Sequence, residues 1–286
     1  MSETTGTVAV SEKFLDLDKV LSAKNPALYK MLPGFLLGFL KRIIHQDTLN
    51  AVIWRNRDLY GLDFVNSSLR EFGANFVVKG LENINAAGRW IIAANHPLGG
   101  LDGMALMKVV GNVKKDILFP VNDLLMNIEN LKELFIPINK HGSNIGNARL
   151  IEQAYASEKG ILYFPAGLCS RKLRDGICDL TWQKSFIVKA RTHMRDIIPC
   201  HIDGKNSNRF YNIANLRNML GIKSNVEMML LVDEMYRQKN KNLTITFGKP
   251  IPFSVFSKSF TDLEWAQKIK NHVYALEKDP AKEFVL

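Results

Sequence analysis

The feature that most constrains the fold of this chain is an alternation of short apolar runs with longer helical patterns between residues 76 and 276. The apolar runs have the length of buried strands, and the stretches between them carry apolar residues at helical spacing. This alternation predicts an α/β fold, with a mixed and largely parallel sheet flanked by helices. Residues 228–236 fit either a strand or a helix. The predicted strands are 76–78, 90–94, 117–121, 135–138, 161–164, 197–201 and 243–247, and the predicted helices are 101–110, 123–133, 145–158, 182–194, 208–220 and 262–276.

The first 75 residues show only helical patterns and predict an N-terminal helical arm with interfacial helices, followed by a sheet domain over residues 76–286 that includes a C-terminal helix. Between Tyr29 and Gln46, Pro33 suits the first turn of a helix, one side of which is apolar. Lys41 and Arg42 lie on the other side. An apolar face beside cations is typical of a helix at a membrane interface, and packing on the protein's own core explains the pattern equally well.

The composition excludes some classes of protein and leaves others open. Of the 286 residues, 47% are hydrophobic, which predicts a substantial core. The net charge of +10 favours an anionic partner, such as a nucleic acid, an anionic membrane surface or a phosphorylated substrate. A nucleic acid is not favoured, because no recognised motif and no interleaved aromatic and basic pattern is present. The longest strongly apolar run, residues 34–40, is too short to span a bilayer, which needs roughly 18 residues.

The termini and the cysteines indicate the compartment. The polar start lacks the basic and apolar regions of a secretory signal. Cys169, Cys178 and Cys200 are odd in number and lack paired CxxC spacing, so they predict neither a disulfide framework nor a zinc site. We expect a protein of the cytoplasmic side, without a bound metal or cofactor.

A histidine and an aspartate share a glycine turn after the predicted strand 90–94. Gly99 and Gly100 would let the backbone fold back, so that the Asp102 carboxylate reaches the imidazole of His96. Such a pair would act as a base and its orienting partner. In the alternative interpretation, His96 is an ordinary loop histidine and Asp102 only the N-cap of the next helix.

Other polar groups follow neighbouring predicted strands. Asn95 precedes His96, residues 139–141 (Asn, Lys and His) follow the strand 135–138, and residues 165–172 follow the strand 161–164. Open α/β sheets bind ligands beyond the carboxyl ends of their strands, so these groups are expected to converge on one crevice.

Four segments resemble, in order and interval, the motifs of the glycerolipid acyltransferase superfamily, which includes lysophosphatidic acid acyltransferases. They are Asn95-His-Pro-Leu-Gly-Gly-Leu-Asp102, Phe135-Ile-Pro-Ile138, Phe164-Pro-Ala-Gly167 and Ile198-Pro199. Residues 96–103 and 201–211 are most similar to the bacterial, hemolysin-like branch that acylates amino-acid lipids such as ornithine and glycine lipids.

The resemblance implies a membrane-associated acyltransferase that moves a fatty acyl group from acyl carrier protein or coenzyme A to a lipid acceptor. His96 would be the general base and Asp102 its partner, while backbone amides near Gly99 and Gly100 would hold the oxyanion. The acceptor would be bound by Asn95, Gly99, Gly100, Gly167, Ser170, Arg171 and Lys172. The resemblance also implies a peripheral enzyme on the cytoplasmic face of the inner membrane, in contact with anionic lipids.

Two departures from the usual motifs bear on the acceptor. Five residues separate His96 from Asp102 where four are usual, and Ala166 and Cys169 stand where the pattern has a glutamate and an arginine. Arg171 is a possible substitute for that arginine. The departures favour an amino-acid lipid or another lyso-lipid over lysophosphatidic acid, whose acylation is the alternative, as is a non-catalytic hemolysin-like membrane protein. Cys169 fits a buried thiol better than a nucleophile, because it lacks a nucleophile elbow.

Overall fold

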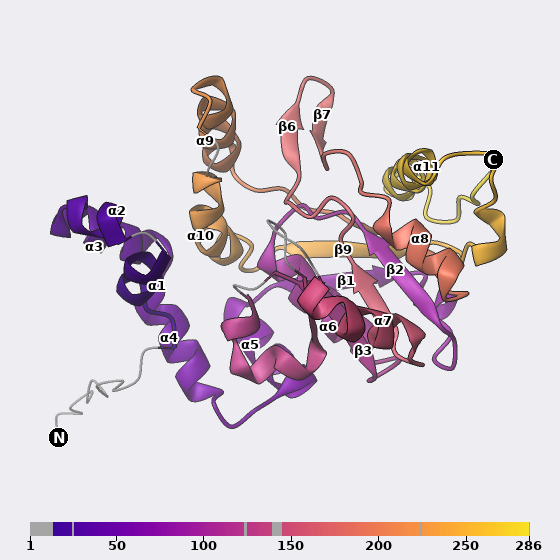
Figure 1. The fold of residues 1–286 in the computed structure, drawn as a ribbon, viewed down its shortest axis with the longest axis horizontal. Coiled ribbons are helices and arrows are strands. Elements are labelled where there is room, and N and C mark those ends of the chain that lie inside the picture. The colour runs from indigo at the N-terminus through magenta and orange to yellow at the C-terminus, as the bar shows by residue number, and fades with distance from the viewer. Residues whose placement is uncertain (1–13, 25, 123–124, 139–144, 223–224, 286) are drawn as a thin grey trace.

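The computed structural model describes residues 14–24, 26–122, 125–138, 145–222 and 225–285. Within them a seven-stranded sheet has the order β1-β9-β8-β2-β5-β3-β4. All neighbouring strands are parallel except β8 and β9, so the predicted mixed, largely parallel sheet is confirmed (Figure 1). The strands are β1 (Asn75–Lys79), β2 (Trp90–Ala94), β3 (Ile117–Val121), β4 (Phe135–Pro137), β5 (Gly160–Tyr163), β8 (Asp196–Ile202) and β9 (Asn242–Phe247).

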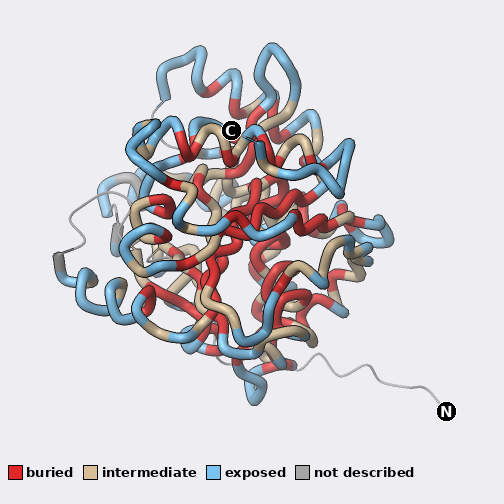
Figure 2. The backbone as a smooth tube through the Cα atoms, turned by 90° about the vertical axis from the view of Figure 1, so that its right-hand side faces the viewer, coloured by how far each residue is buried: buried red, intermediate tan, exposed pale blue. Residues whose placement is uncertain are grey.

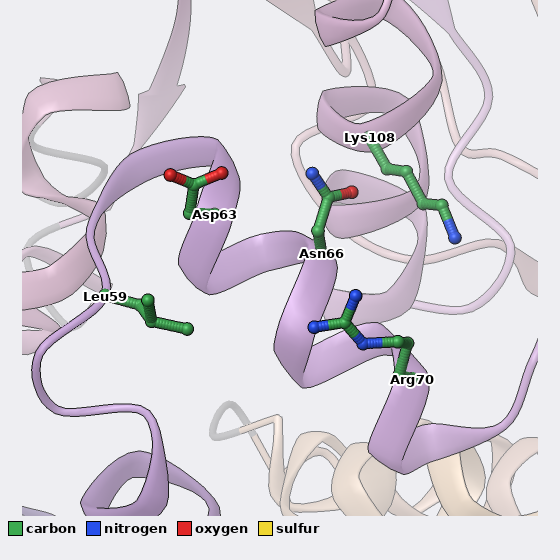
Figure 3. A pocket seen from close by; sticks show the side chains of 5 residues that line it. All are labelled: Leu59, Asp63, Asn66, Arg70 and Lys108. Carbon is green, nitrogen blue, oxygen red and sulfur yellow. The ribbon is translucent and has the colours of Figure 1, made fainter.

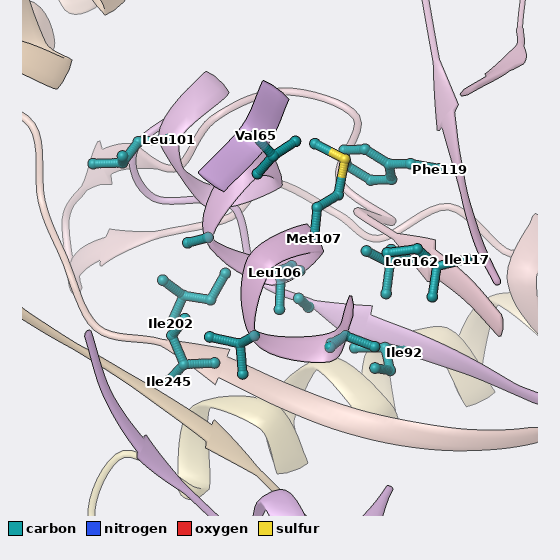
Figure 4. Packing of buried hydrophobic residues seen from close by; sticks show 14 of the residues in the cluster. Val65, Ile92, Leu101, Leu106, Met107, Ile117, Phe119, Leu162, Ile202 and Ile245 are labelled. Carbon is teal, nitrogen blue, oxygen red and sulfur yellow. The ribbon is translucent and has the colours of Figure 1, made fainter. Parts of the chain in front are cut away.

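Strand β2 lies at the centre of the sheet and is buried at every position. Its side chains alternate between the two faces, as the period of a strand requires. Ile92 and Ala94 belong to the core shared with α5 and α6, which Figure 4 shows from close by. Ile91 and Ala93 belong to the second core, on the opposite face. A continuous apolar run is therefore needed here, because both faces of the strand are covered.

Helices cover both faces of the sheet, and Figure 2 shows buried backbone concentrated between them. The first core contains residues of α5 (Gly61–Phe72) and α6 (Gly100–Gly111). The second contains residues of α7 (Ala148–Ala156), α8 (Ser185–Thr192) and α11 (Asp262–Ala275). Because α5 packs in the same core as the sheet, packing joins it to the sheet domain, and the division at residue 75 stays a prediction.

The remaining N-terminal helices are α1 (Leu17–Lys24), α2 (Pro26–Met31), α3 (Gly34–Ile43) and α4 (Gln46–Arg55). The predicted helix with an apolar side is α3, and none of its residues is buried. Phe35 is 81% and Phe39 52% exposed, so the described part of the chain does not cover this helix as a core would. No described helix combines the length and the apolar character needed to cross a membrane.

Some elements differ from the sequence prediction. In place of a helix over 123–133, the described residues form two 3-10 helices, η2 (Leu125–Asn127) and η3 (Glu129–Leu134). The ambiguous residues 228–236 are helical. A hairpin of β6 and β7 was not predicted, because strands of three residues that pair only with each other carry no periodic signal. The other elements are η1 (Leu81–Asn83), η4 (Ile145–Asn147), β6 (Arg171–Leu173), β7 (Gly176–Cys178), α9 (Asn208–Met219), η5 (Val226–Leu230), α10 (Leu231–Tyr236) and η6 (Phe253–Val255).

Candidate active site

The segments that follow β2 and β5 meet at one edge of the sheet. Both strands are parallel, so their carboxyl ends lie at the same edge, as predicted. The backbone N–H of Ser170, in the loop after β5, donates a 2.8 Å hydrogen bond to the carbonyl of His96. The loop after β8 joins them, because the Asn206 side chain donates to the carbonyl of Pro97 at 3.0 Å. Three loops thus fix the position of His96.

His96 and Asp102 form a hydrogen-bonded pair. The Nδ1 atom of His96 lies 3.0 Å from Oδ2 of Asp102. The same oxygen accepts hydrogen bonds from the backbone N–H groups of Leu98, at 2.7 Å, and Gly99, at 3.0 Å. Asp102 stands in the first turn of α6, so it caps the helix and orients the histidine at once. The N-cap residue is Gly99, so Asp102 does not hold the position that the alternative interpretation gave it and caps the helix from the third helical position.

Gly99 absorbs the extra residue between His96 and Asp102. Its φ angle is +87°, a conformation that only glycine adopts easily. A Cβ at this position would also lie 2.9 Å from Cδ1 of Leu231. Gly100 needs no such freedom and begins α6. The longer spacing is therefore compatible with the pair.

The imidazole of His96 is held in an apolar setting. Its ring stacks on Phe164, with centroids 4.1 Å apart, and Phe164 in turn packs edge-on against Phe119. Burial raises the pKa of the Asp102 carboxyl. Burial also opposes protonation of His96, but the neighbouring Cys169 sulfur and the Asp102 carboxylate raise its pKa to about 10. Cys169 is a free, buried thiol, as predicted. The ring must lose a proton before it can serve as a base.

We therefore expect the rate of acyl transfer to rise with pH. A base is inactive while protonated, so kcat/KM should increase about tenfold per pH unit until the pH approaches the His96 pKa of about 10. Cys169→Ala should shift this limb to lower pH, because it removes an interaction that raises the pKa. The measurement is kcat/KM from pH 6 to 10 in both proteins. A flat profile, or an unshifted limb in Cys169→Ala, would contradict the expectation.

Asp179 organises the site and was missed by sequence reasoning. Its buried Oδ1 atom accepts the backbone N–H of His96 at 3.2 Å and the hydroxyl of Ser170 at 2.6 Å. Its Oδ2 atom accepts Nε1–H of Trp182 at 2.9 Å. The backbone N–H of Asp179 donates to the Tyr274 hydroxyl at 2.7 Å, which links the site to α11. No motif marks this aspartate in the sequence, and two of its partners, His96 and Tyr274, lie 83 and 95 positions away.

Asp179→Asn is expected to lower the transfer rate by about 10- to 100-fold, because an amide has one acceptor oxygen for three donors and His96 loses its fixed position. Ser170→Ala, which removes a single donor, should cost much less. Steady-state rates, compared at equal folded fraction from thermal unfolding, provide the measurement. A rate of Asp179→Asn within twofold of the wild type would contradict the positioning role assigned to Asp179.

Several predicted acceptor-binding residues have their polar atoms occupied. The Asn95 amide exchanges two hydrogen bonds with the backbone of Ile202, at 2.7 and 2.9 Å, and so ties β2 to β8. The Ser170 hydroxyl donates a hydrogen bond to Asp179. Gly167 occupies a turn with φ of +66°, and Lys172 is exposed on β6. These contacts favour a positioning role for Asn95 and Ser170, and acceptor binding by the set stays a prediction.

Arg171 belongs to a buried ion network that centres on Glu227. Its guanidinium donates to the carbonyl of Cys169 at 2.7 Å and to Glu227 at 2.7 Å. Nε of Arg217 lies 2.9 Å from the other oxygen of Glu227. Arg171 is only 4% exposed, so in this arrangement it supports the loop beside His96 and faces Glu227. The predicted cluster of residues 139–141 lies outside the described residues.

The amides at the start of α6 divide into two groups. The Gly99 amide is already bonded to Asp102, which removes it from the groups predicted to hold an oxyanion. The amides of Gly100 and Leu101 make no hydrogen bond among the described residues and occupy the positive end of the helix. Among those same residues, no group of three or more His, Cys, Asp or Glu side chains is placed to hold a metal ion.

A separate hollow of about 380 Å³ lies between α5 and α6 (Figure 3). Lys108, one of its lining residues, is six positions beyond Asp102 on α6, which corresponds to about 9 Å along the helix axis. None of the predicted site residues lines it. The hollow is lined by Leu59, Asp63, Asn66, Arg70 and Lys108.

A family model described as Acyltransferase matches residues 19–280. This chain belongs to the acyltransferase family, as its motifs predicted. It is 43% identical over 264 residues to the lyso-glycine lipid O-acyltransferase of Bacteroides thetaiotaomicron, covering 92% of this chain and 97% of the relative. It is 42% identical to the enzyme of that name from Phocaeicola vulgatus, covering 92% and 95%. Among solved structures, it resembles the 1-acyl-sn-glycerophosphate acyltransferase PlsC from Thermotoga maritima, with 14% identity, a TM-score of 0.48 and coverage of 85% and 97%.

Proposed function

We propose that this acyltransferase moves a fatty acyl group from a thioester donor to the hydroxyl of a lyso-glycine lipid, an amino-acid lipid that carries one acyl chain fewer than the product. The observation that carries the proposal is the likeness over 92% of the chain to two lyso-glycine lipid O-acyltransferases. The buried pair of His96 and Asp102 supports it, because O-acyl transfer needs a base beside the acceptor hydroxyl.

The chemistry proceeds in two balanced steps. The unprotonated Nε2 of His96 takes the proton of the acceptor hydroxyl as its oxygen attacks the thioester carbonyl, and Asp102 stabilises the imidazolium. The amides of Gly100 and Leu101 would hold the oxyanion of the tetrahedral intermediate. The intermediate then collapses to the ester, the carbon–sulfur bond breaks, and His96 returns its proton to the leaving thiolate. No covalent acyl-enzyme is needed.

The departures within the third motif support an acceptor without a glycerol phosphate. Ala166 and Cys169 replace two polar residues of the usual pattern, and Arg171 is neutralised by Glu227. A phosphate monoester would bring two negative charges to a loop in which Cys169 replaces the arginine of the usual motif, whereas a glycine carboxylate brings one. We therefore place lysophosphatidic acid second.

The donor is acyl carrier protein or coenzyme A in thioester linkage, and the enzyme works as a peripheral protein at the cytoplasmic face of the inner membrane. Helix α3 supports this part of the proposal. Next to it lies a hollow of about 610 Å³, lined by Phe35, Leu36, Gly38, Phe39 and Arg42. Apolar walls with one cation suit an acyl chain below an anionic headgroup.

The test is acyl transfer by the purified protein, with mass spectrometry of the products. Lyso-glycine lipid and lysophosphatidic acid are offered separately, each with acyl carrier protein or coenzyme A thioesters, and His96→Ala serves as the control. We expect an O-acylated glycine lipid in the wild type alone. Preferred acylation of lysophosphatidic acid would overturn the assigned acceptor, and transfer to neither lipid would overturn the proposed function.

A further inference from the structure

We propose that the end of α9 and the β6–β7 hairpin form a second surface that contacts anionic lipid, so that together with α3 they seat the catalytic crevice on the bilayer. The inference deepens the proposed function, on which it rests for the lipid acceptor. We call this surface the rim and define it by two groups of exposed residues. They are Leu216, Met219, Leu220, Ile222 and Val226 around the end of α9, and Lys172, Leu173 and Arg174 on the hairpin.

The end of α9 exposes an unusual amount of apolar surface. Met219 is 76% and Leu220 61% exposed, and Leu216, Ile222 and Val226 lie close by in the chain. Soluble monomers rarely leave contiguous apolar patches of this kind uncovered, and such patches mark interaction sites. No element of the described chain covers these side chains.

The rim is continuous with α3. Helix η5 packs against both α3 and α9, and β6 packs against α9. Ile43, at the end of α3, packs on the buried cluster that contains Cys169, Phe210 and Leu230. Figure 1 shows α9 and the hairpin projecting side by side from the same side of the molecule. The exposed apolar residues of the three elements therefore belong to one surface.

The charges of this surface match an anionic bilayer. Lys172 and Arg174 on the hairpin and Arg42 on α3 are exposed and form no ion pair among the described residues. By contrast, Arg171, one residue before Lys172, is buried against Glu227. Apolar side chains flanked by free cations fit acyl chains below negatively charged headgroups, where each basic residue adds to the attraction. A protein partner would not require cations at both ends of the apolar surface.

The elements that carry the rim adjoin the loop of the catalytic pair. Leu231, at the start of α10, contacts Gly99, and Cys169 belongs both to the cluster beneath α9 and to the surroundings of His96. The elements that carry the rim and the loop that holds His96 are therefore packed together.

The test measures binding to vesicles of phosphatidylcholine with and without phosphatidylglycerol by co-sedimentation. The double variant Met219→Asp/Ile222→Asp should bind phosphatidylglycerol vesicles about tenfold more weakly than the wild type. Leu263→Asp, at an exposed apolar site on α11, is the matched control and should bind within twofold of the wild type. Arg42→Gln/Arg174→Gln should lose binding only to the vesicles that contain phosphatidylglycerol.

Activity assays separate this inference from the proposed function. With the acceptor in detergent, Met219→Asp/Ile222→Asp should keep the wild-type rate, whereas transfer in vesicles should fall about tenfold. Unchanged vesicle binding of that variant would overturn the inference that the rim contacts lipid. The inference would also be overturned if the wild type self-associated or bound acyl carrier protein and the variant did not, because the surface would then be a protein interface. Absence of any transfer in detergent would overturn the proposed function instead, since vesicle binding needs no reaction.

Discussion

Replacing His96 with alanine is expected to lower the rate of acyl transfer by about 10³-fold and to leave the fold intact. The imidazole is the group placed to take the acceptor proton, and general-base catalysis contributes about 10²- to 10⁴-fold. The side chain of His96 is hydrogen-bonded to Asp102. Its backbone carbonyl and N–H are hydrogen-bonded to Ser170 and Asp179 respectively. The variant retains those backbone bonds. Product formation under single-turnover conditions, with circular dichroism as the check on folding, provides the measurement.

Asp102→Asn is a second test of the proposed pair. An amide oxygen in the place of Oδ2 can still accept from Leu98, Gly99 and His96, so the helix cap survives and only the negative charge is lost. The rate should still fall by about 10²- to 10⁴-fold, because the imidazolium loses its counter-charge. Transfer by His96→Ala or Asp102→Asn within threefold of the wild type would exclude the proposed mechanism.

The largest expected effect on stability comes from Glu227. Its two oxygens pair with Arg171 and Arg217, and its side chain has no exposed surface. Glu227→Gln would leave two buried guanidinium groups without a counter-charge, and removing one partner of a buried ion pair costs about 3–5 kcal/mol. We expect the free energy of unfolding, from urea titration, to fall by that amount.

The pair of Arg55 and Glu71, which is more exposed than Glu227 and its partners, provides the comparison for this prediction. Arg55 is about half exposed, and Glu71→Gln should change the free energy of unfolding by less than about 1 kcal/mol. The triple variant Arg171→Met/Arg217→Met/Glu227→Leu should recover most of the stability lost in Glu227→Gln, because it removes all three charges together. Equal losses in Glu227→Gln and Glu71→Gln would contradict the assignment.

Much of the fold could be predicted because its strands carry strong local signals. The bounds predicted for β2 and β3 agree with the structure, since both are short apolar runs. The family could be predicted from four ordered motifs, and the pair of His96 and Asp102 lies within one turn of chain, so its geometry is nearly local. The helix predicted over 123–133 was wrong for the described residues, which form two 3-10 helices instead.

The supporting residues of the site could not be predicted, because their roles depend on partners far away in the chain. Asp179 binds His96 across 83 positions, and Arg171 binds Glu227 across 56. In the sequence, Arg171 and Lys172 are adjacent cations that were both predicted to bind the acceptor. In the structure, one is buried in an ion network and the other is exposed to solvent.

The sequence by itself thus determined the α/β class, the acyltransferase family and the closeness of His96 to Asp102, since each depends on periodicity or on residues a few positions apart. The tertiary structure alone decided which polar groups remain free for substrate. Burial forces a polar group to find a partner, and those partners come from wherever the fold brings the chain together. It also decided that Phe35 and Phe39 of α3, and Leu216 and Met219 of α9, are exposed, which no helical pattern distinguishes from residues turned to the core.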